Sequence, residues 1–108
     1  MFDGHNDALT GASHALLASG GGEGHLDLPR MRAGNVRGAI FAVFTESEAD
    51  HADPAPQADG SYARPLAPPV AFADAAAAST TTAGRLFALE RAGVVRIART
   101  IADVDRAA

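Results

Sequence analysis

The chain has 108 residues, a net charge of -4 and no cysteine. This length suits one small domain, the acidic balance excludes a basic nucleic-acid-binding surface, and the missing thiols exclude disulfides and thiolate-held metals. The sequence has no apolar run of the roughly 20 residues that cross a membrane, and no basic and apolar leader of a signal peptide. We therefore expect a cytoplasmic protein with neither nucleic acid nor membrane among its partners.

Large apolar side chains are scarce in the sequence. Alanine supplies 26 residues, whereas there are five Phe, one Tyr and no Trp. Burial contributes roughly 25 cal/mol per Å² of apolar surface, and alanine has little surface to bury against the entropy cost of folding. The composition predicts a thin core, and a chain that is part of a larger folding unit.

Residues 2–7 are predicted to form a short strand that ends in the motif Asp3-Gly4-His5-Asn6-Asp7. Because side chains alternate along a strand, His5 and Asp7 should project to one side and Asn6 to the other. An imidazole nitrogen and a carboxylate oxygen are both ligands that suit zinc. The alternative is an ordinary surface histidine after a turn, and these few residues alone leave both interpretations open.

A glycine-rich stretch follows the motif. Ser13–Ala18 could form one or two helical turns. The glycine run at 20–24 lacks the Gly-Lys-Ser/Thr that completes a phosphate-binding loop, so that function is not expected.

Residues 25–34 carry the signals of a helix of about two turns. Asp27 can cap its N-terminus, Pro29 suits its first turn, and Gly34 stands where it should end. The same stretch holds a second His-x-Asp pair, His25 and Asp27. At the start of a helix these two residues do not share a face, so we interpret Asp27 as a cap and not as a metal ligand.

Residues 36–44 are the clearest strand, since the run from 39 to 44 is apolar throughout. Such a pattern is typical of a parallel strand that is covered on both faces. Residues 46–69 are rich in Asp, Glu, Ala and Pro and predict a long loop, of the kind that serves as a lid beside a substrate or stays disordered. His51 lies in this loop and is interpreted as a surface residue.

Residues 70–92 predict a long helix, with a helical apolar stripe that ends at Gly93. Val94–Ala98 could be a further strand, and Thr100 could cap a last helix that runs to Ala108. Strands that alternate with helices indicate an α/β fold with a parallel sheet. Two strands and a doubtful third cannot close a barrel.

Two stretches, read together, resemble the opening of the membrane (renal) dipeptidase family. They are Asp-Gly-His-Asn-Asp at 3–7 and Asp-Leu-Pro-Arg-Met-Arg-Ala-Gly-Asn-Val-Arg-Gly-Ala-Ile-Phe-Ala-Val-Phe-Thr at 27–45. Residues 95–104 look like the segment before that family's next barrel strand. Members are metallopeptidases of the amidohydrolase type on a (β/α)8 TIM barrel. The resemblance covers nearly the whole chain, with the motifs in the same order.

The resemblance implies that His5 and Asp7 bind one ion of a two-zinc centre that hydrolyses dipeptides. A bridging carboxylate, two histidines and a catalytic aspartate would come from later strands. A barrel of this kind takes about 200 residues or more, so residues 1–108 are expected to be an incomplete N-terminal portion of the barrel, inactive alone. Whether the complete enzyme is a homodimer stays open.

Two other interpretations are compatible with the sequence. The chain could belong to a different metal-dependent amidohydrolase, in which a carboxylated lysine replaces the bridging glutamate. It could also be a non-catalytic α/β fragment that needs a partner chain, with His5 and Asp7 in a structural role only.

Overall fold

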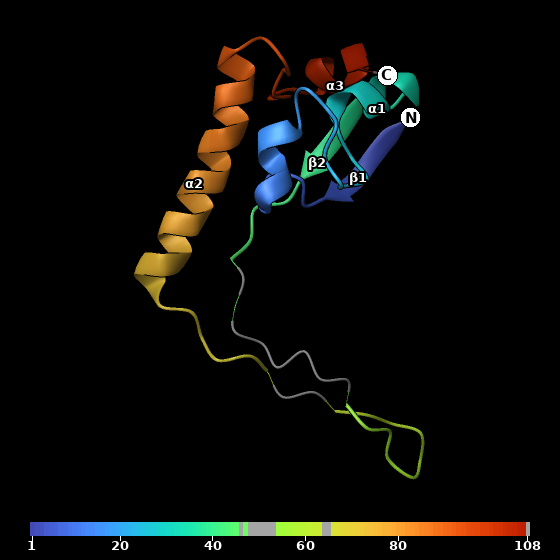
Figure 1. The fold of residues 1–108 in the computed structure, drawn as a ribbon, viewed down its shortest axis with the longest axis vertical. Coiled ribbons are helices and arrows are strands. Elements are labelled where there is room, and N and C mark those ends of the chain that lie inside the picture. The colour runs from blue at the N-terminus through green and yellow to red at the C-terminus, as the bar shows by residue number, and fades with distance from the viewer. Residues whose placement is uncertain (46, 48–53, 64–65, 108) are drawn as a thin grey trace.

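A computed structural model describes residues 1–45, 47, 54–63 and 66–107. Strands β1 (Phe2–Asn6) and β2 (Gly38–Phe41) form a two-stranded sheet, and they run parallel as predicted. The connection between them carries a 3-10 helix, η1 (Ala12–Leu16), and helix α1 (Leu28–Ala33). Figure 1 shows the two strands side by side, with the long helix α2 (Phe72–Arg91) to one side of them. The fold is therefore mixed α and β; its membership of a barrel stays a prediction.

The pairing of β1 with β2 contains one irregularity. Phe2 pairs with Gly38 and Asp3 with Ala39, but the register shifts before Asn6 pairs with Phe41. At the start of the pair the Phe2 ring lies against Gly38, and a Cβ added to Gly38 would clash with Phe2 Cε2. The glycine lets the aromatic ring lie close to the neighbouring strand.

Helix α1 begins where the sequence predicts it. The Asp27 carboxylate accepts a hydrogen bond from Arg30 N at 2.7 Å and is 4% exposed, which confirms its role as the N-cap. Gly34 is the C-cap of the helix. The left-handed turn that follows is made by Asn35, with φ of 53°, a conformation that asparagine tolerates better than most residues.

Helix α2 is confirmed within two residues of its predicted start and one of its end. Gly93 has φ of 69° and follows the helix, where Val94 N donates to Leu89 O at 3.0 Å. The threonine run does not break the helix. Thr80 Oγ1 donates to Ala76 O at 2.7 Å, and Thr82 is buried.

The strand suggested at Val94–Ala98 is not formed in the described residues. The backbone there bonds to helix α2 instead, since Ile97 N donates to the Glu90 carboxylate at 3.1 Å. Helix α3 (Ile101–Ala107) then begins after Thr100 as predicted. Asp103 N donates to Thr100 Oγ1 at 3.3 Å, while Thr100 N donates to the Asp103 carboxylate at 2.9 Å. This reciprocal pair is the usual pattern of a capping box.

A cluster of charges joins α2 to the segment before α3. Arg99 donates from its two terminal guanidinium nitrogens, Nη1 and Nη2, to the two Glu90 oxygens at 2.7 Å. This bidentate hydrogen bond from Arg99, with the bond from Ile97 N, lowers the pKa of Glu90 to about 2. The pKa of Asp103 is also lowered, chiefly by the hydrogen bond from the Thr100 side chain. The cluster fixes the C-terminal turn of the chain against the end of α2.

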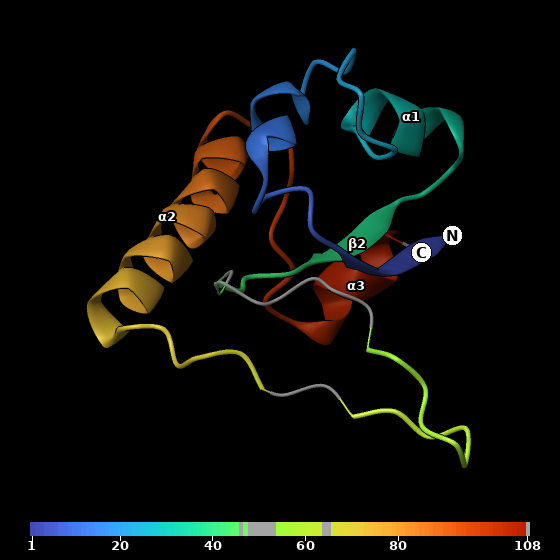
Figure 2. The ribbon, with the colours of Figure 1, turned by 60° about the horizontal axis from the view of Figure 1, so that its bottom comes forward.

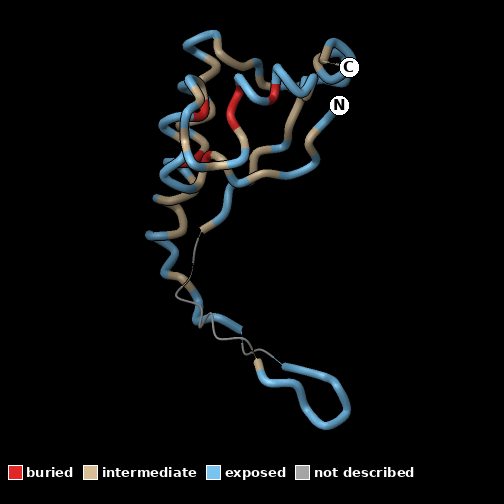
Figure 3. The backbone as a smooth tube through the Cα atoms, turned by 45° about the vertical axis from the view of Figure 1, so that its right-hand side comes forward, coloured by how far each residue is buried: buried red, intermediate tan, exposed pale blue. Residues whose placement is uncertain are grey.

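The core is small, as the composition predicts. Its buried apolar residues in the described part of the chain are Leu9, Leu17, Leu28 and Met31. Figure 3 shows the buried positions gathered between α2, α1 and the loop after β1. Residues of β2 and α2 complete the layer around the core: Ala39, Phe41, Leu86 and Leu89.

Strand β2 is covered on one face only. Ala39 and Phe41 pack towards the core, whereas Ile40 between them is 54% exposed, and Val43 and Phe44 beyond the strand are exposed too. The expectation of a strand buried on both faces is therefore wrong for the described residues. No described element packs on the outer face closely enough to bury Ile40.

The predicted loop 46–69 contains neither helix nor strand in its described parts, 47, 54–63 and 66–69. Residues 54–63 lead away from the strands and helices (Figures 1 and 2). The radius of gyration is 17.5 Å, against about 13 Å for a compact chain of this length. His51 and most of the acidic residues of the loop lie outside the described residues, so their predicted roles stay predictions.

Candidate metal centre

The His-x-Asp motif lies at the carboxyl end of β1. His5 belongs to the strand and Asp7 directly follows its last residue, Asn6. Because β1 and β2 are parallel, the segment after β2 leaves the sheet at the same edge, and Ala42 N donates to Asn6 O at 2.8 Å. In α/β barrels this edge carries the functional side chains.

The two motif side chains face one another. His5 Nε2 lies 3.1 Å from Asp7 Oδ1, and the side chains are 69% and 56% exposed. On a tetrahedral zinc with usual bond lengths, a nitrogen and an oxygen ligand are about 3.3 Å apart. The pair thus has nearly the spacing of two corners of a zinc site. The same distance also suits a hydrogen bond, whose donor depends on the imidazole tautomer.

Asp3 and Asn6 have a different role, which the sequence interpretation did not anticipate. Asn6 Nδ2 donates to Asp3 Oδ2 at 2.8 Å and to Ile40 O on β2 at 3.3 Å. Asp3 Oδ1 also accepts from His5 N at 3.2 Å. These bonds lie at the irregular part of the ladder and tie the end of β1 to β2. Short Asp and Asn side chains commonly bond to nearby backbone in this way.

The turn from Asp7 to Thr10 holds the second motif residue. Thr10 donates to Asp7 O from its backbone N at 2.9 Å and from its hydroxyl at 2.8 Å. Arg85 of α2 reaches the same turn, where its Nη1 donates to Leu9 O at 2.6 Å and to Thr10 O at 3.1 Å. The turn is therefore joined to a helix 75 residues farther along the chain.

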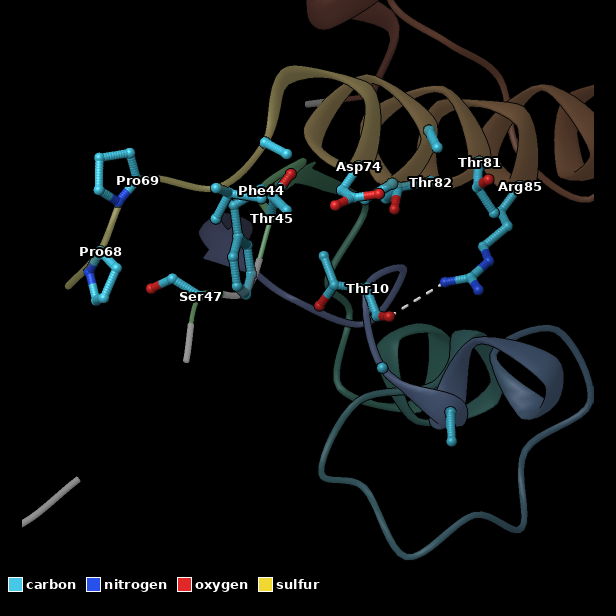
Figure 4. Close-up of a pocket in the computed structure, with 16 residues that line it drawn as sticks. Thr10, Phe44, Thr45, Ser47, Pro68, Pro69, Asp74, Thr81, Thr82 and Arg85 are labelled. Carbon is cyan, nitrogen blue, oxygen red and sulfur yellow. Dashed lines mark hydrogen bonds between the residues drawn. The ribbon is translucent and has the colours of Figure 1, made fainter. Parts of the chain in front are cut away.

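An open groove of about 930 Å³ lies beside this turn. Thr10 borders it from the loop after β1, Thr45 from the segment after β2, and Asp74 and Arg85 from α2 (Figure 4). Neither His5 nor Asp7 is among its lining residues. The groove is a neighbour of the metal motif and not its binding cavity.

The second His-x-Asp pair forms no comparable site. His25 is exposed, whereas Asp27 is buried, caps α1 and forms an ion pair with Arg30 Nη1 at 3.3 Å. The prediction that Asp27 acts as a cap is confirmed. Its carboxylate oxygens face α1.

His5 and Asp7 supply a nitrogen and an oxygen donor that converge, which fits a zinc ion. Zinc usually takes four ligands, at least three of them from protein, and no group of three His, Cys, Asp or Glu side chains converges in the described part of the chain. The pair is thus half of a site at most.

No described helix is both long and apolar enough to cross a membrane.

No family model matches the chain, and comparisons with curated proteins and with solved structures give no match either. The resemblance to the dipeptidases therefore depends on the two motif stretches of the sequence.

Proposed function

We propose that the chain is the N-terminal part of a zinc-dependent dipeptidase built on a (β/α)8 barrel. In this proposal His5 and Asp7 bind one of two zinc ions. The observation that carries it is the approach of His5 Nε2 to 3.1 Å from Asp7 Oδ1 at the carboxyl end of a parallel strand. The reaction, hydrolysis of dipeptides, is the one that the sequence resemblance at 3–7 and 27–45 implies.

The residues around the motif have clear tasks under this proposal. His5 is held in the strand, and the Asn6 side chain ties the strand end to Ile40 O of β2. Asp7 stands in the turn that Thr10 closes. The chemistry supplied by the bound ions would be Lewis-acid activation of water and of the scissile carbonyl for hydrolysis of a dipeptide. The part of this chain is to place one nitrogen and one oxygen ligand.

The surface of the chain supports a larger folding unit. The outer face of β2 is exposed at Ile40, and Val43 and Phe44 are exposed where the chain leaves the strand. Exposed apolar residues beside a two-stranded sheet suit contact with further strands and helices. With two metal ligands in the described part, we expect residues 1–108 alone to show no peptidase activity.

The test begins with the genomic DNA on both sides of the reading frame. The proposal expects a continuing frame that encodes a bridging glutamate and two further histidine ligands. A lysine at the bridging position would favour another amidohydrolase class. A frame without further ligands would contradict a metallopeptidase.

The second part of the test is the activity of the complete protein on unblocked dipeptides with added zinc. We expect His5→Ala to lower kcat/KM by more than about 100-fold, the upper range for residues that only support a ligand. His25→Ala is the matched control, because it removes an exposed histidine from the other His-x-Asp pair. Equal activity of the two variants would overturn the proposal. Zinc-dependent hydrolysis by residues 1–108 alone would contradict the expectation that they are an incomplete part of the enzyme.

A further inference from the structure

We propose that Arg85 is a positioning residue for the metal pair: it fixes the turn from Asp7 to Thr10 and thereby the carboxylate of Asp7. This inference depends on the proposed function, since it assigns Asp7 as a ligand. It adds a residue of helix α2 that the His-x-Asp motif does not contain.

The two ligands are supported to different degrees. His5 lies within β1, between Asp3 and Asn6, which both pair with β2, and its backbone N donates to Asp3 Oδ1 at 3.2 Å. Asp7 lies beyond the last strand residue, so the ladder does not reach it. The direction of its carboxylate therefore depends on the turn that follows. An error of a few tenths of an ångström in that turn would change the 3.1 Å separation between Asp7 Oδ1 and His5 Nε2.

Arg85 fixes the far side of this turn. Its Nη1 donates to two successive carbonyl oxygens, Leu9 O at 2.6 Å and Thr10 O at 3.1 Å. The donor is a charged guanidinium, and hydrogen bonds from charged donors are stronger than those between neutral groups. Leu9 is 1% exposed, so its side chain is anchored in the core while its carbonyl is bound by Arg85. Figure 4 shows the guanidinium reaching from α2 to the turn.

Thr10 transmits this restraint to Asp7. Its backbone N and its hydroxyl both donate to Asp7 O, at 2.9 Å and 2.8 Å. The path from α2 to the ligand thus contains only Arg85, Thr10 and the Asp7 backbone. Groups that orient metal ligands commonly change metal affinity by about 10–100-fold when they are removed. Because Arg85 acts through the backbone, we expect the lower end of that range.

The test is a titration of the complete protein with zinc, monitored by NMR of the histidine rings. His5→Ala identifies the His5 signals. Arg85→Ala should raise the Kd for zinc at His5 by about tenfold, and Arg91→Ala, an exposed arginine on the same helix, should leave it unchanged. Arg85→Lys should restore part of the affinity, because a single nitrogen makes both bonds and an ammonium can replace it.

Thr10→Val keeps Arg85 and removes only the threonine hydroxyl. This second variant tests the same path if Arg85→Ala does not fold. It should weaken zinc binding in the same direction by a smaller factor. The far-UV circular dichroism of each variant at the titration temperature reports whether it is folded.

The outcomes separate this inference from the proposed function. Zinc binding at His5 in the wild type, with the same Kd in folded Arg85→Ala and Thr10→Val, would refute the positioning role and leave the proposed function intact. No zinc effect at His5 in the complete wild-type protein would refute both. A lower melting temperature with unchanged zinc affinity would make Arg85 a purely structural residue.

Discussion

The chain holds two His-x-Asp pairs, and replacement of Asp27 tests whether the carboxylate of the second pair caps a helix or binds a metal. Asp27 is 4% exposed, accepts from Arg30 N at 2.7 Å and forms an ion pair with Arg30 Nη1 at 3.3 Å. Loss of an N-cap costs about 1 kcal/mol, and a buried hydrogen bond to a charged group contributes about 1.5–3 kcal/mol. These two figures describe the same bond in part, so they are not added.

We expect Asp27→Ala to lower the free energy of unfolding by about 2 kcal/mol. The Arg30 side chain is 52% exposed, and ion pairs at the surface add little. Asp27→Asn keeps an acceptor at the cap and should therefore cost less than half as much. In a domain of this size 2 kcal/mol corresponds to a fall of about 10 °C in the melting temperature.

The assay is thermal unfolding followed by far-UV circular dichroism, with a zinc titration of each variant below its transition. Asp27→Ala should retain zinc binding at His5, because Asp27 faces α1. An unchanged melting temperature would refute the cap argument. Loss of the zinc effect at His5 in a folded Asp27 variant would refute the distinction between the two pairs.

Two further predictions concern stability. Leu17→Ala, at a side chain 1% exposed, should cost about 3 kcal/mol, whereas Leu66→Ala, at 97% exposed, should cost almost nothing; equal urea midpoints would contradict the description of the core. Because Arg99 lowers the pKa of Glu90 from 4.5 to about 2, Glu90 stabilises the fold above about pH 4.5, and this contribution is lost as the pH falls towards 2. Glu90→Gln should remove that part of the pH dependence of the melting temperature, and Glu23→Gln, at an exposed residue outside the cluster, should not; equal pH profiles would count against the role of the Glu90–Arg99 pair.

Local signals in the sequence predicted several elements well. Asp27, Pro29 and Gly34 marked the limits of α1, and Thr100 marked the start of α3. These signals succeed because a cap satisfies backbone groups of its own helix, within a few residues. The parallel pairing of β1 with β2 also followed from the apolar pattern of residues 39–44.

Features that depend on distant contacts were harder to predict. Val94–Ala98 has the composition of a strand, yet the Glu90 carboxylate binds the Ile97 backbone and keeps this segment against α2. The apolar character of β2 indicated burial on both faces, but burial depends on which elements pack there, and Ile40 remains exposed.

In the candidate site, too, local features could be predicted from the sequence and distant contacts could not. The alternation of a strand was enough to place His5 and Asp7 on one side, and the two side chains do face one another. The contacts of Arg85 with Leu9 O and Thr10 O could not be predicted, because 75 or more residues separate the partners. The bonds of Asn6 to Asp3 and Ile40 depend on the irregular ladder, for which the sequence carries no distinct signal.

The most direct test of the zinc pair is to record the nitrogen resonances of the imidazole rings in the complete protein as zinc is added. We predict that His5 Nε2 shifts in a saturable way, and that Asp7→Asn weakens this response while His14 and His25 stay unchanged. A shift at His5 Nδ1 in place of Nε2, an equal response of all the histidines, or no effect of Asp7→Asn would contradict the shared ion.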